Sequence, residues 1–416
     1  MTQGISTVLP SSPVKRGWPE EGITRVPAWI YSDPDLYRRE LNEFFGGDSW
    51  NFVGLECEVP EVGSFKRAWI ADRQVIVVRD ADGINVVENR CSHRGGAIVW
   101  QNKGKTKMLT CPYHQWGFDL KGNCRGVSLK RGVHGEGGMP EDFDMEKHGL
   151  CKLRVACVGG SIWATFSGTV PPFEEYCGPV AMQRLTRLMP GRSLRMLGQS
   201  RQLIPCNWKL YFENTRDPYH GTLLHTFFIT FGLYRADSRH VTAPQQGGMH
   251  AVNFAAPGER KGDGSITREL KRFRDIKLND MEAVQFVDEY GDGEMTAMQL
   301  FPGAFVQQHA NILAIRTIIP KGVGETEVDW TYFGYADDDE KMQRIRLKQA
   351  NLLGPSGFVS MDDSELLKQM QNQVAGYHES IGVVEMGGRD VKPQVTMATE
   401  VGIRAFYDFY RHRLGL

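Results

Sequence analysis

The stretch ENRCSHRGGAIVW (residues 88–100) places a cysteine and a histidine two positions apart, followed by an arginine and two glycines. A second stretch, CPYHQWGF (residues 111–118), contains another such pair. The combined pattern is C-x-H, a gap of 17 residues, and then C-x-x-H. Cys91, His93, Cys111 and His114 are therefore four candidate metal ligands on two short loops.

Two kinds of metal centre use two cysteines and two histidines together. Tetrahedral zinc accepts both residue types, whereas a Rieske cluster holds one iron with two cysteines and the other with two histidines. Each loop here supplies one cysteine and one histidine, so two similar loops can clamp two irons. Gly95, Gly96 and Pro112 would let the backbone approach a cluster closely. The pattern favours the Rieske cluster, with zinc or unliganded core residues as the alternatives.

Both pairs lie in a part of the chain, residues 49–168, that has the pattern of short strands and turns. Its segments rich in valine, isoleucine and aromatic residues are separated by ADG, KGN and GG turn signals. Residues 1–48 contain a leader rich in serine and proline and then a helix at 32–47, which ends at two glycines. We therefore expect an all-β module at 49–168 after a leader and one helix.

The remaining residues, 169–416, mix helical and strand patterns. Strands that would form an antiparallel sheet are expected at 297–308, 311–320 and 327–336. Helices are expected at 173–189, 207–228, 339–353 and 398–414. A polar, Gly-rich segment at about 240–280 would cover a site. The expected fold class is α+β.

The composition of the chain excludes several function classes. It has 416 residues with 49 basic and 50 acidic side chains, which gives no reason to expect nucleic acid or an anionic membrane as partner. There is no secretory signal and no apolar run of the roughly 18 residues that a membrane-spanning helix needs. We expect a cytoplasmic protein whose eight cysteines form no disulfide framework.

A second set of candidate ligands lies in NWKLYFENTRDPYHGTLLHTFF (residues 207–228). His220 and His225 are five positions apart, so they would not stack on an ideal helix. Pro218 and Gly221 would distort a helix there and let both imidazoles reach one ion. Two histidines and one carboxylate form the facial triad of non-haem Fe(II) oxygenases, although the histidine pair alone is equally consistent with surface or core residues.

The third ligand has to come from elsewhere in the chain. GPSGFVSMDDSE (residues 354–365) offers Asp362, Asp363 and Glu365 after a glycine-rich bend. An acidic pair there is also typical of an exposed helix start. Spacing alone does not select between Asp362 and Asp363.

The two sets together resemble the large (α) subunit of Rieske non-haem iron aromatic ring-hydroxylating oxygenases, in particular those acting on salicylate and terephthalate. The resemblance covers nearly the whole chain, including ENRCSHRG, CPYHQW, NWKLYFEN, DPYHGTLLH, RLKQANLLGPSGFVSMDD and VVEMGG. It implies a Rieske [2Fe-2S] module inserted in a helix-grip-like α+β catalytic domain that holds mononuclear Fe(II). It also implies that Asp363 is the ligand of the acidic pair.

The resemblance implies hydroxylation of an aromatic ring with O2 and electrons from NAD(P)H, delivered through separate ferredoxin and reductase proteins. It implies a head-to-tail trimer in which Asp217 joins His220 to His114 of a neighbouring copy, with Asn214 lining the same pocket. A small β subunit, giving α3β3, is expected from the family. Judged from the residues alone, Asp217 is equally well a turn residue before Pro218.

The substrate is suggested by Arg316, which interrupts the apolar pattern NILAIRTIIP (residues 311–320). A buried arginine needs an anionic partner, and a substrate carboxylate offers two oxygens to its guanidinium; an internal ion pair is the alternative. The salicylate and terephthalate oxygenases carry arginine at the matching position. Gln308 and His309 are candidates for contacting an ortho group on the ring, or are simply part of a polar hairpin turn.

Met397 stands where terephthalate-oxygenating relatives carry a second arginine, which favours a monocarboxylate such as salicylate, anthranilate or a 2-halobenzoate. A dicarboxylate or another ring is the alternative within this fold. A non-catalytic Rieske electron carrier is the remote alternative, since it would need only the all-β module.

Overall fold

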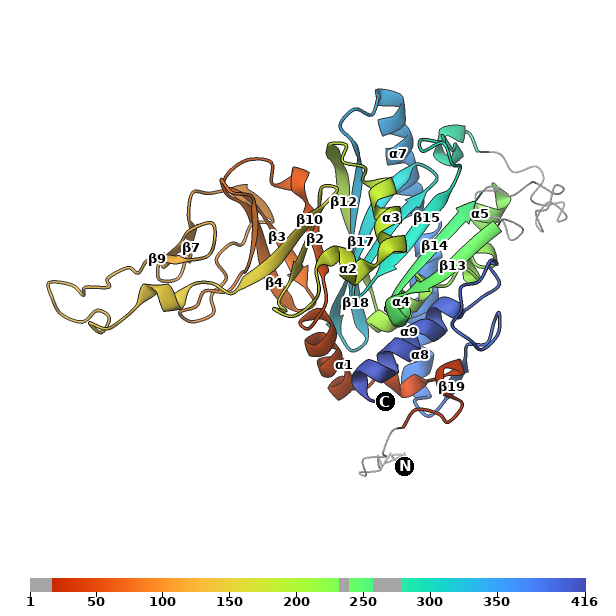
Figure 1. Cartoon of the computed structure of the whole chain (residues 1–416), viewed down its shortest axis with the longest axis horizontal. Helices are drawn as coiled ribbons and strands as arrows, with labels where there is room; N and C mark the ends of the chain where they lie inside the picture. The colour runs from red at the N-terminus through yellow and green to blue at the C-terminus, as the bar shows by residue number, and fades with distance from the viewer. Residues whose placement is uncertain (1–16, 232–238, 257–277) are drawn as a thin grey trace, which may run out of the picture.

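The computed structural model describes residues 17–231, 239–256 and 278–416. The leader up to residue 16 and most of the segment that we expected to cover a site lie outside the described residues. The described chain forms two parts, a β-rich projection and a larger α+β body (Figure 1). The expected fold class, an all-β module joined to an α+β domain with an antiparallel sheet, is confirmed.

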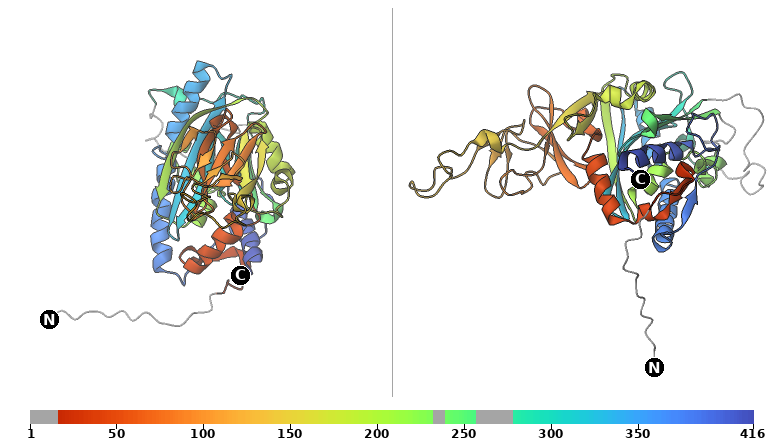
Figure 2. Two further views of the ribbon diagram at one scale, coloured as in Figure 1. Left: turned by 90° about the vertical axis from the view of Figure 1, so that its left-hand side faces the viewer. Right: turned by 60° about the horizontal axis from the view of Figure 1, so that its bottom comes forward.

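The projection contains a seven-stranded antiparallel sheet and a three-stranded sheet at its far end. The larger sheet has the order β2 (Asn51–Leu55), β11 (Ser161–Thr165), β10 (Lys152–Val158), β5 (Ile84–Glu88), β4 (Arg73–Arg79), β3 (Ser64–Ile70), β6 (Lys103–Lys105). The small sheet consists of β7 (Leu109–Thr110), β8 (Gly117–Phe118) and β9 (Cys124–Gly126). We call the small sheet, with the loops at 89–100 and 111–116, the tip; the right-hand view of Figure 2 shows how it stands out from the body.

Strand β4 shows how the projection is attached to the body. Successive side chains on a strand point to opposite faces. Val75 and Val77 accordingly belong to the main core of the molecule, whereas Ile76 and Val78 pack in the separate core of the tip with Cys91. Because both faces of this strand are buried, its sequence, RQVIVVR, is a nearly continuous apolar run.

The body is built on a second seven-stranded antiparallel sheet. Its order is β12 (Leu194–Ile204), β18 (Glu325–Tyr335), β17 (Ile312–Gly322), β16 (Ala304–His309), β15 (Met295–Leu300), β14 (His250–Ala256), β13 (Arg239–Gln245). The strands expected at 311–320 and 327–336 are present as β17 and β18, whereas the single strand expected at 297–308 is a hairpin of two strands, β15 and β16, that turns at residues 301–303. The β13–β14 hairpin was not expected, because the sequence there was assigned to a polar covering segment.

Helices cover both faces of this sheet (Figure 1). The α-helices of the described residues are α1 (Pro34–Glu40), α2 (Phe173–Cys177), α3 (Pro179–Leu188), α4 (Trp208–Asn214), α5 (Thr226–Thr230), α7 (Glu340–Leu353), α8 (Ser360–Gly376) and α9 (Val401–Leu414). Helices α2 and α3 pack on one face, where Phe173 of α2 and Leu185 of α3 share a core with Val306. Helices α4 and α9 pack on the other face, where Trp208 and Phe406 share a core with Trp330.

Two expected helices are broken. The segment 173–189 is interrupted at Gly178, whose φ of +78° is incompatible with a continuous right-handed helix. The segment 207–228 is helical only to Asn214 and then continues through a 3-10 turn, His220–Thr222, to α5. The first break lets α2 and α3 follow the sheet; the second places two histidines at separate points.

The described residues that precede the projection, from residue 17 on, are part of the body. Strand β1 (Arg25–Pro27) pairs with β19 (Ile381–Val383), and the right-hand view of Figure 2 shows this segment beside α9. Tyr31 donates a hydrogen bond to Glu213 on α4 (2.7 Å) and contacts the Tyr407 hydroxyl on α9 (3.0 Å). Within the described ranges, no helix has the length and apolar character needed to cross a lipid bilayer.

Candidate active site

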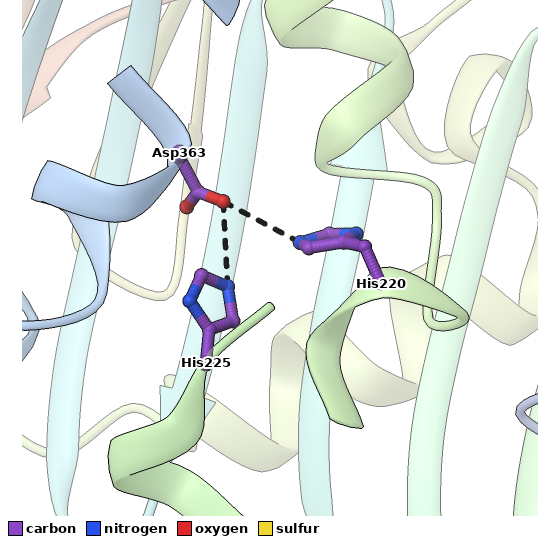
Figure 3. Close-up of side chains that lie close together, drawn as sticks. All are labelled: His220, His225 and Asp363. Carbon is purple, nitrogen blue, oxygen red and sulfur yellow. Dashed lines mark ion pairs between the residues drawn. The ribbon is translucent and has the colours of Figure 1, made fainter. Parts of the chain in front are cut away.

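Three side chains from separate elements meet above the sheet of the body (Figure 3). His220 lies in the 3-10 turn, His225 just before α5, and Asp363 in the first turn of α8. The Oδ1 atom of Asp363 is 3.5 Å from His220 Nε2 and 3.3 Å from His225 Nε2. One atom from each side chain lies within 4.8 Å of the others, so a single metal ion fits between them.

The chain between the two histidines explains why they converge. Helix α4 ends at Asn214, and Pro218 cannot donate the backbone hydrogen bond that would continue it. His220 and His225 therefore lie on different turns, with their ring centroids 5.2 Å apart. In the described part of the chain, this is the only cluster of three histidine, cysteine or acidic side chains with metal-binding geometry.

The structure separates the two aspartates that spacing left equivalent. The Asp363 side chain is 7% exposed and faces both Nε2 atoms, whereas the Asp362 side chain is 42% exposed and lies 3.5 Å from His225 Nδ1. Nearby His225 and His220 lower the pKa of Asp363 despite the opposing effect of burial. A buried carboxylate between two imidazoles suits a metal ligand, so Asp363 is the better placed of the two aspartates to bind an ion.

Two further polar residues orient these three. Asp217 Oδ2 lies 3.2 Å from His220 Nδ1, which leaves the Nε2 of that ring free to face a metal. Asn214 donates from Nδ2 to Asp363 Oδ1 at 3.0 Å. Burial would lower the pKa of His220, but the hydrogen bond to Asp217 and the charges of Asp363 and Asp217 raise it overall.

A cavity of about 130 Å³ lies next to the three side chains, between them and the sheet. Arg316 on β17 lines it and is 7% exposed. Its guanidinium donates to the Tyr211 hydroxyl (3.1 Å) and to Gln307 Oε1 (2.6 Å), and stacks on Trp330 at 3.8 Å from the ring centroid. No acidic side chain among the described residues pairs with it, and its Nε has no hydrogen-bond partner.

The register of the β16–β17 hairpin decides which glutamine faces the cavity. Arg316 pairs with Phe305, so the side chains of residues 305, 307 and 309 lie on its face and that of Gln308 lies on the other. Gln308 accepts a hydrogen bond from Arg187 (2.8 Å) and donates to the Ala310 carbonyl (2.9 Å). Gln308 also belongs to the cavity lining, so its contact with a substrate stays a prediction, but Gln307 is the glutamine whose side chain contacts Arg316.

His309 and Met397 are placed differently from each other. His309 lines the cavity and stacks on Phe228 with centroids 4.6 Å apart. Burial, with the nearby charges of Arg316 and His225, lowers its pKa to about 4, so the ring is neutral at pH 7. Met397 is buried in the loop before α9 but is not among the described residues that line the cavity.

Several cavity residues were missed from the sequence. Gln307 and Tyr211 contact Arg316, and His240 and Asn253 line the cavity from β13 and β14. Burial lowers the pKa of His240 to about 4. Counting alternate residues back from Arg316 through a two-residue turn would have identified Gln307. No local pattern indicated Tyr211, His240 or Asn253.

The four Cys and His residues of the tip lie on two loops with the same hydrogen-bonded turn. Cys91 N donates to Gly96 O and Gly95 N to Cys91 O; in the other loop Cys111 N donates to Trp116 O and Gln115 N to Cys111 O, all at 2.8–3.0 Å. Gly95 and Gln115 both have positive φ, +78° and +57°.

The two loops sort their side chains by type. Cys91 and Cys111 are both 2% exposed, and burial followed by the neighbouring Cys111 raises the pKa of the Cys91 thiol. The His93 and His114 rings are partly exposed and have centroids 4.8 Å apart. Two neighbouring buried thiols and two neighbouring imidazoles match a two-iron cluster, in which two cysteines hold one iron and two histidines the other.

The chain matches known proteins along most of its length. Residues 185–416 match the family described as "Ring hydroxylating alpha subunit (catalytic domain)", and residues 49–134 match "Rieske [2Fe-2S] domain". The chain is 43% identical to the large oxygenase component of salicylate 5-hydroxylase from Ralstonia sp, over 99% of both chains.

Other relatives share this coverage. Identity is 38% with subunit alpha 2 of the terephthalate 1,2-dioxygenase terminal oxygenase component from Comamonas sp, over 96% of this chain and 97% of that one. It is 37% with the anthranilate 1,2-dioxygenase large subunit from Burkholderia cepacia, over 96% and 95%. The solved structure of naphthalene 1,2-dioxygenase from Rhodococcus sp. superposes with a TM-score of 0.78 over 94% of both chains, at 23% identity.

Proposed function

The chain belongs to the Rieske ring-hydroxylating oxygenase family as a large (α) subunit, and from that premise we propose that it hydroxylates the ring of an aromatic monocarboxylate with an ortho substituent. Salicylate, anthranilate and 2-halobenzoates are the substrates that we put forward. Whether one or two oxygen atoms enter the ring is left to the experiment below.

An α subunit of this family is an oxygenase that uses a [2Fe-2S] cluster, mononuclear iron and O2. We assign the cluster to Cys91, His93, Cys111 and His114, and the mononuclear iron to His220, His225 and Asp363. When bound, the cluster supplies electrons and the iron activates O2. The chain's own side chains have to orient these ligands, hold the ring and keep water away.

The buried Arg316 is the observation that carries the substrate proposal. Its guanidinium keeps its positive charge in proteins, yet no described carboxylate pairs with it. An unpaired buried charge is costly, and a substrate carboxylate entering the cavity would supply the missing partner. The same carboxylate would hold the ring beside the proposed iron ligands, which line the same cavity.

The cavity size favours one ring over several. Its volume is about 130 Å³. An engineered cavity of about 150 Å³ in another protein binds benzene, so this space matches a monocyclic ring. The relatives named for salicylate and anthranilate, at 43% and 37% identity, act on monocyclic ortho-substituted acids, which supports the same choice.

A terephthalate-type activity is the second candidate, because a relative at 38% identity carries that name. A dicarboxylate needs a second cation opposite the first. The position that we expected to supply it is Met397, which is buried away from the cavity lining described here. We therefore favour the monocarboxylate.

The remaining roles follow from this assignment. We propose that Asp217 orients His220 and accepts a second hydrogen bond from His114 of a neighbouring copy, and that Asn214 holds Asp363. Electrons would come from NAD(P)H through a ferredoxin and a reductase, and a small β subunit would complete an α3β3 assembly. The proposed domain boundaries are 1–48 and 169–416 for the catalytic domain and 49–168 for the Rieske domain.

The test is a substrate panel with the purified oxygenase, a ferredoxin, a reductase, NADH and labelled O2. The panel contains salicylate, anthranilate, 2-chlorobenzoate, benzoate, terephthalate and naphthalene, with products identified by mass spectrometry. We expect label in the products of the ortho-substituted acids. One labelled atom identifies a monohydroxylase and two a dioxygenase.

The variant Arg316→Met tests the anchor directly. Removing one partner of a buried charged hydrogen bond costs about 2–5 kcal/mol, so kcat/KM for the carboxylates should fall by roughly 30-fold or more. Turnover of naphthalene or terephthalate without turnover of the ortho-substituted acids would refute the substrate proposal and leave the family assignment intact.

A further inference from the structure

Arg316 is not the only buried donor at its end of the cavity. Gln307, on the adjacent strand β16, is 3% exposed and also lines the cavity. Its Nε2 atom has no hydrogen-bond partner, and neither has Arg316 Nε. Buried amide groups are normally paired, so two unpaired donors side by side indicate a missing acceptor.

The orientation of the Gln307 amide is fixed by chemistry. Its oxygen and nitrogen would be hard to distinguish by shape alone. Here one of the two atoms lies 2.6 Å from Arg316 Nη2, which can only donate. That atom must therefore be the oxygen, because a nitrogen there would set two donors against each other. The NH2 group of Gln307 is consequently the end that is left without a partner.

A carboxylate is the ligand group that matches this arrangement. The Arg316 guanidinium already uses Nη1 for Tyr211 and Nη2 for Gln307, which leaves Nε–H as its free donor. A carboxylate has two oxygens and can accept from Nε–H and from the amide NH2 together. A carboxamide would present its own NH2 to one of the two donors, which is unfavourable.

We propose that Gln307 is a second substrate-binding residue, which donates a hydrogen bond to the substrate carboxylate beside Arg316 and makes the site select carboxylates over carboxamides. This inference rests on the proposed function. It adds a residue that was not among the candidates named from the sequence, which included its neighbour Gln308. It also gives Gln307 two simultaneous tasks, since its oxygen orients the guanidinium and its nitrogen contacts the substrate.

An unpaired amide nitrogen does not by itself identify a binding residue. Gln299 on β15 is fully buried, accepts a hydrogen bond from Thr215, and also has an Nε2 without a partner. Gln299 is absent from the described cavity lining, whereas Gln307 is part of it and touches Arg316. Gln299→Met is therefore a matched control for the loss of a buried strand glutamine.

The experiment measures dissociation constants by calorimetry on the purified oxygenase with its cluster in place. Salicylate, benzoate and salicylamide are the probes, and the proteins are wild type, Gln307→Met, Gln307→Glu, Gln299→Met and Arg316→Met. Visible absorbance of the cluster, iron content and the thermal midpoint report on folding. A hydrogen bond to a charged group contributes about 1.5–3 kcal/mol, which corresponds to roughly 10- to 100-fold in affinity.

We expect Gln307→Met to raise the dissociation constants of salicylate and benzoate by that factor. The dissociation constant of salicylamide should rise by less than about threefold. Gln307→Glu should weaken the two carboxylates further, because it adds a like charge and pairs with Arg316. Gln299→Met should lower the thermal midpoint without changing the carboxylate affinities. If Gln307→Met weakened salicylate but left benzoate unchanged, the amide would contact the ortho group and the inference would be overturned.

Failure of this inference and failure of the proposed function give different results. In the first case, wild type binds the carboxylates, Arg316→Met does not bind them, and Gln307→Met binds them as tightly as wild type does. That result would show that only the Gln307 inference is wrong. If wild type binds uncharged rings and none of the carboxylates, the proposed substrate class is wrong, and the role of Gln307 is wrong with it.

Discussion

The two candidate metal sites differ in how the chain brings their ligands together. In the tip, all four candidate ligands lie within residues 91–114, and the two loops that carry them are repeats of one backbone-hydrogen-bonded turn. In the body, Asn214 and Asp363 are 149 positions apart and are joined by packing of α4 and α8 around a seven-stranded sheet. Local sequence therefore determines the first site, and long-range packing determines the second.

The solvent exposure of the candidate ligands also differs between the tip and the body. The tip has its own small core and presents partly exposed imidazoles at the end of a projection. In the body, the candidate ligands His225 and Asp363 are buried and His220 is 22% exposed, whereas nearby Glu213 accepts hydrogen bonds from Tyr31 and Tyr407. A site that gives electrons to or takes them from another protein needs an exposed end, whereas a site that controls reactive oxygen needs enclosure.

Replacing one candidate ligand in each region should remove one metal centre and leave the other in place. This is the largest effect that we expect. Asp363→Ala removes the only carboxylate from the cluster of three, so mononuclear iron and activity should fall to background while the red-brown absorbance of the Rieske cluster remains. Cys91→Ser should remove that absorbance and leave mononuclear iron. Metal analysis and visible spectra check both. Loss of both centres in either variant would contradict the independence of the regions.

Asp217→Asn probes the proposed contact between Asp217 and the tip of a neighbouring copy. The amide keeps the size of the side chain but removes the charge that orients His220. Changes of this kind around metal ligands cost about 10- to 100-fold, so we expect kcat to fall by about 100-fold with the content of both metals unchanged. Stopped-flow oxidation of the reduced cluster in the presence of substrate measures the step. A reduced metal content would show instead that Asp217 only supports the fold.

Glu213→Gln tests the buried charge of the body. Burial raises the pKa of Glu213 to about 7, against hydrogen bonds from Tyr407 and Tyr31 that lower it. The folded state therefore binds a proton more tightly than the unfolded chain, and stability is lost as pH rises from about 4.5 to 7. Between pH 5 and 8 the loss should be about 2 kcal/mol.

The glutamine variant does not titrate, so its thermal midpoint should fall less between pH 5 and pH 8 than that of wild type. The exposed Glu365→Gln is the control and should behave as wild type. The temperature at which the cluster absorbance disappears should be unaffected, because Glu213 belongs to the body. Equal pH dependence in Glu213→Gln and wild type would contradict the role given to this carboxyl group.

Gly95→Ala tests the repeated turn of the tip, with the smallest expected effect. Gly95 has a φ of +78°, a conformation that costs a side-chain-bearing residue about 1–2 kcal/mol. The cluster should be lost at a lower temperature while the midpoint of the body is unchanged. Gln115→Gly makes the opposite replacement at the equivalent position of the other loop, where a residue with a side chain has a positive φ. If Gly95→Ala were as stable as wild type, the left-handed turn would not be what holds the first loop.

Much of the fold followed from local patterns, and the exceptions have physical causes. The antiparallel strands at 295–335 have long apolar runs that only a buried sheet explains. The hairpin of β13 and β14 was missed because the polar residues next to it in sequence dominated its composition. The helix expected over 207–228 was broken because Pro218 and the contacts of Asp217 and His220 outweigh local helix propensity.

The sequence by itself determined the four candidate ligands of the tip, because their spacing within two short loops favours one kind of metal centre. It also determined His220 and His225 as candidates and the presence of an arginine within an apolar strand. Only the tertiary structure favoured Asp363 over Asp362 as the candidate ligand and placed Gln307 beside Arg316. Those choices depend on which face of a helix or strand is buried against a distant element, and a shift of one residue reverses the face.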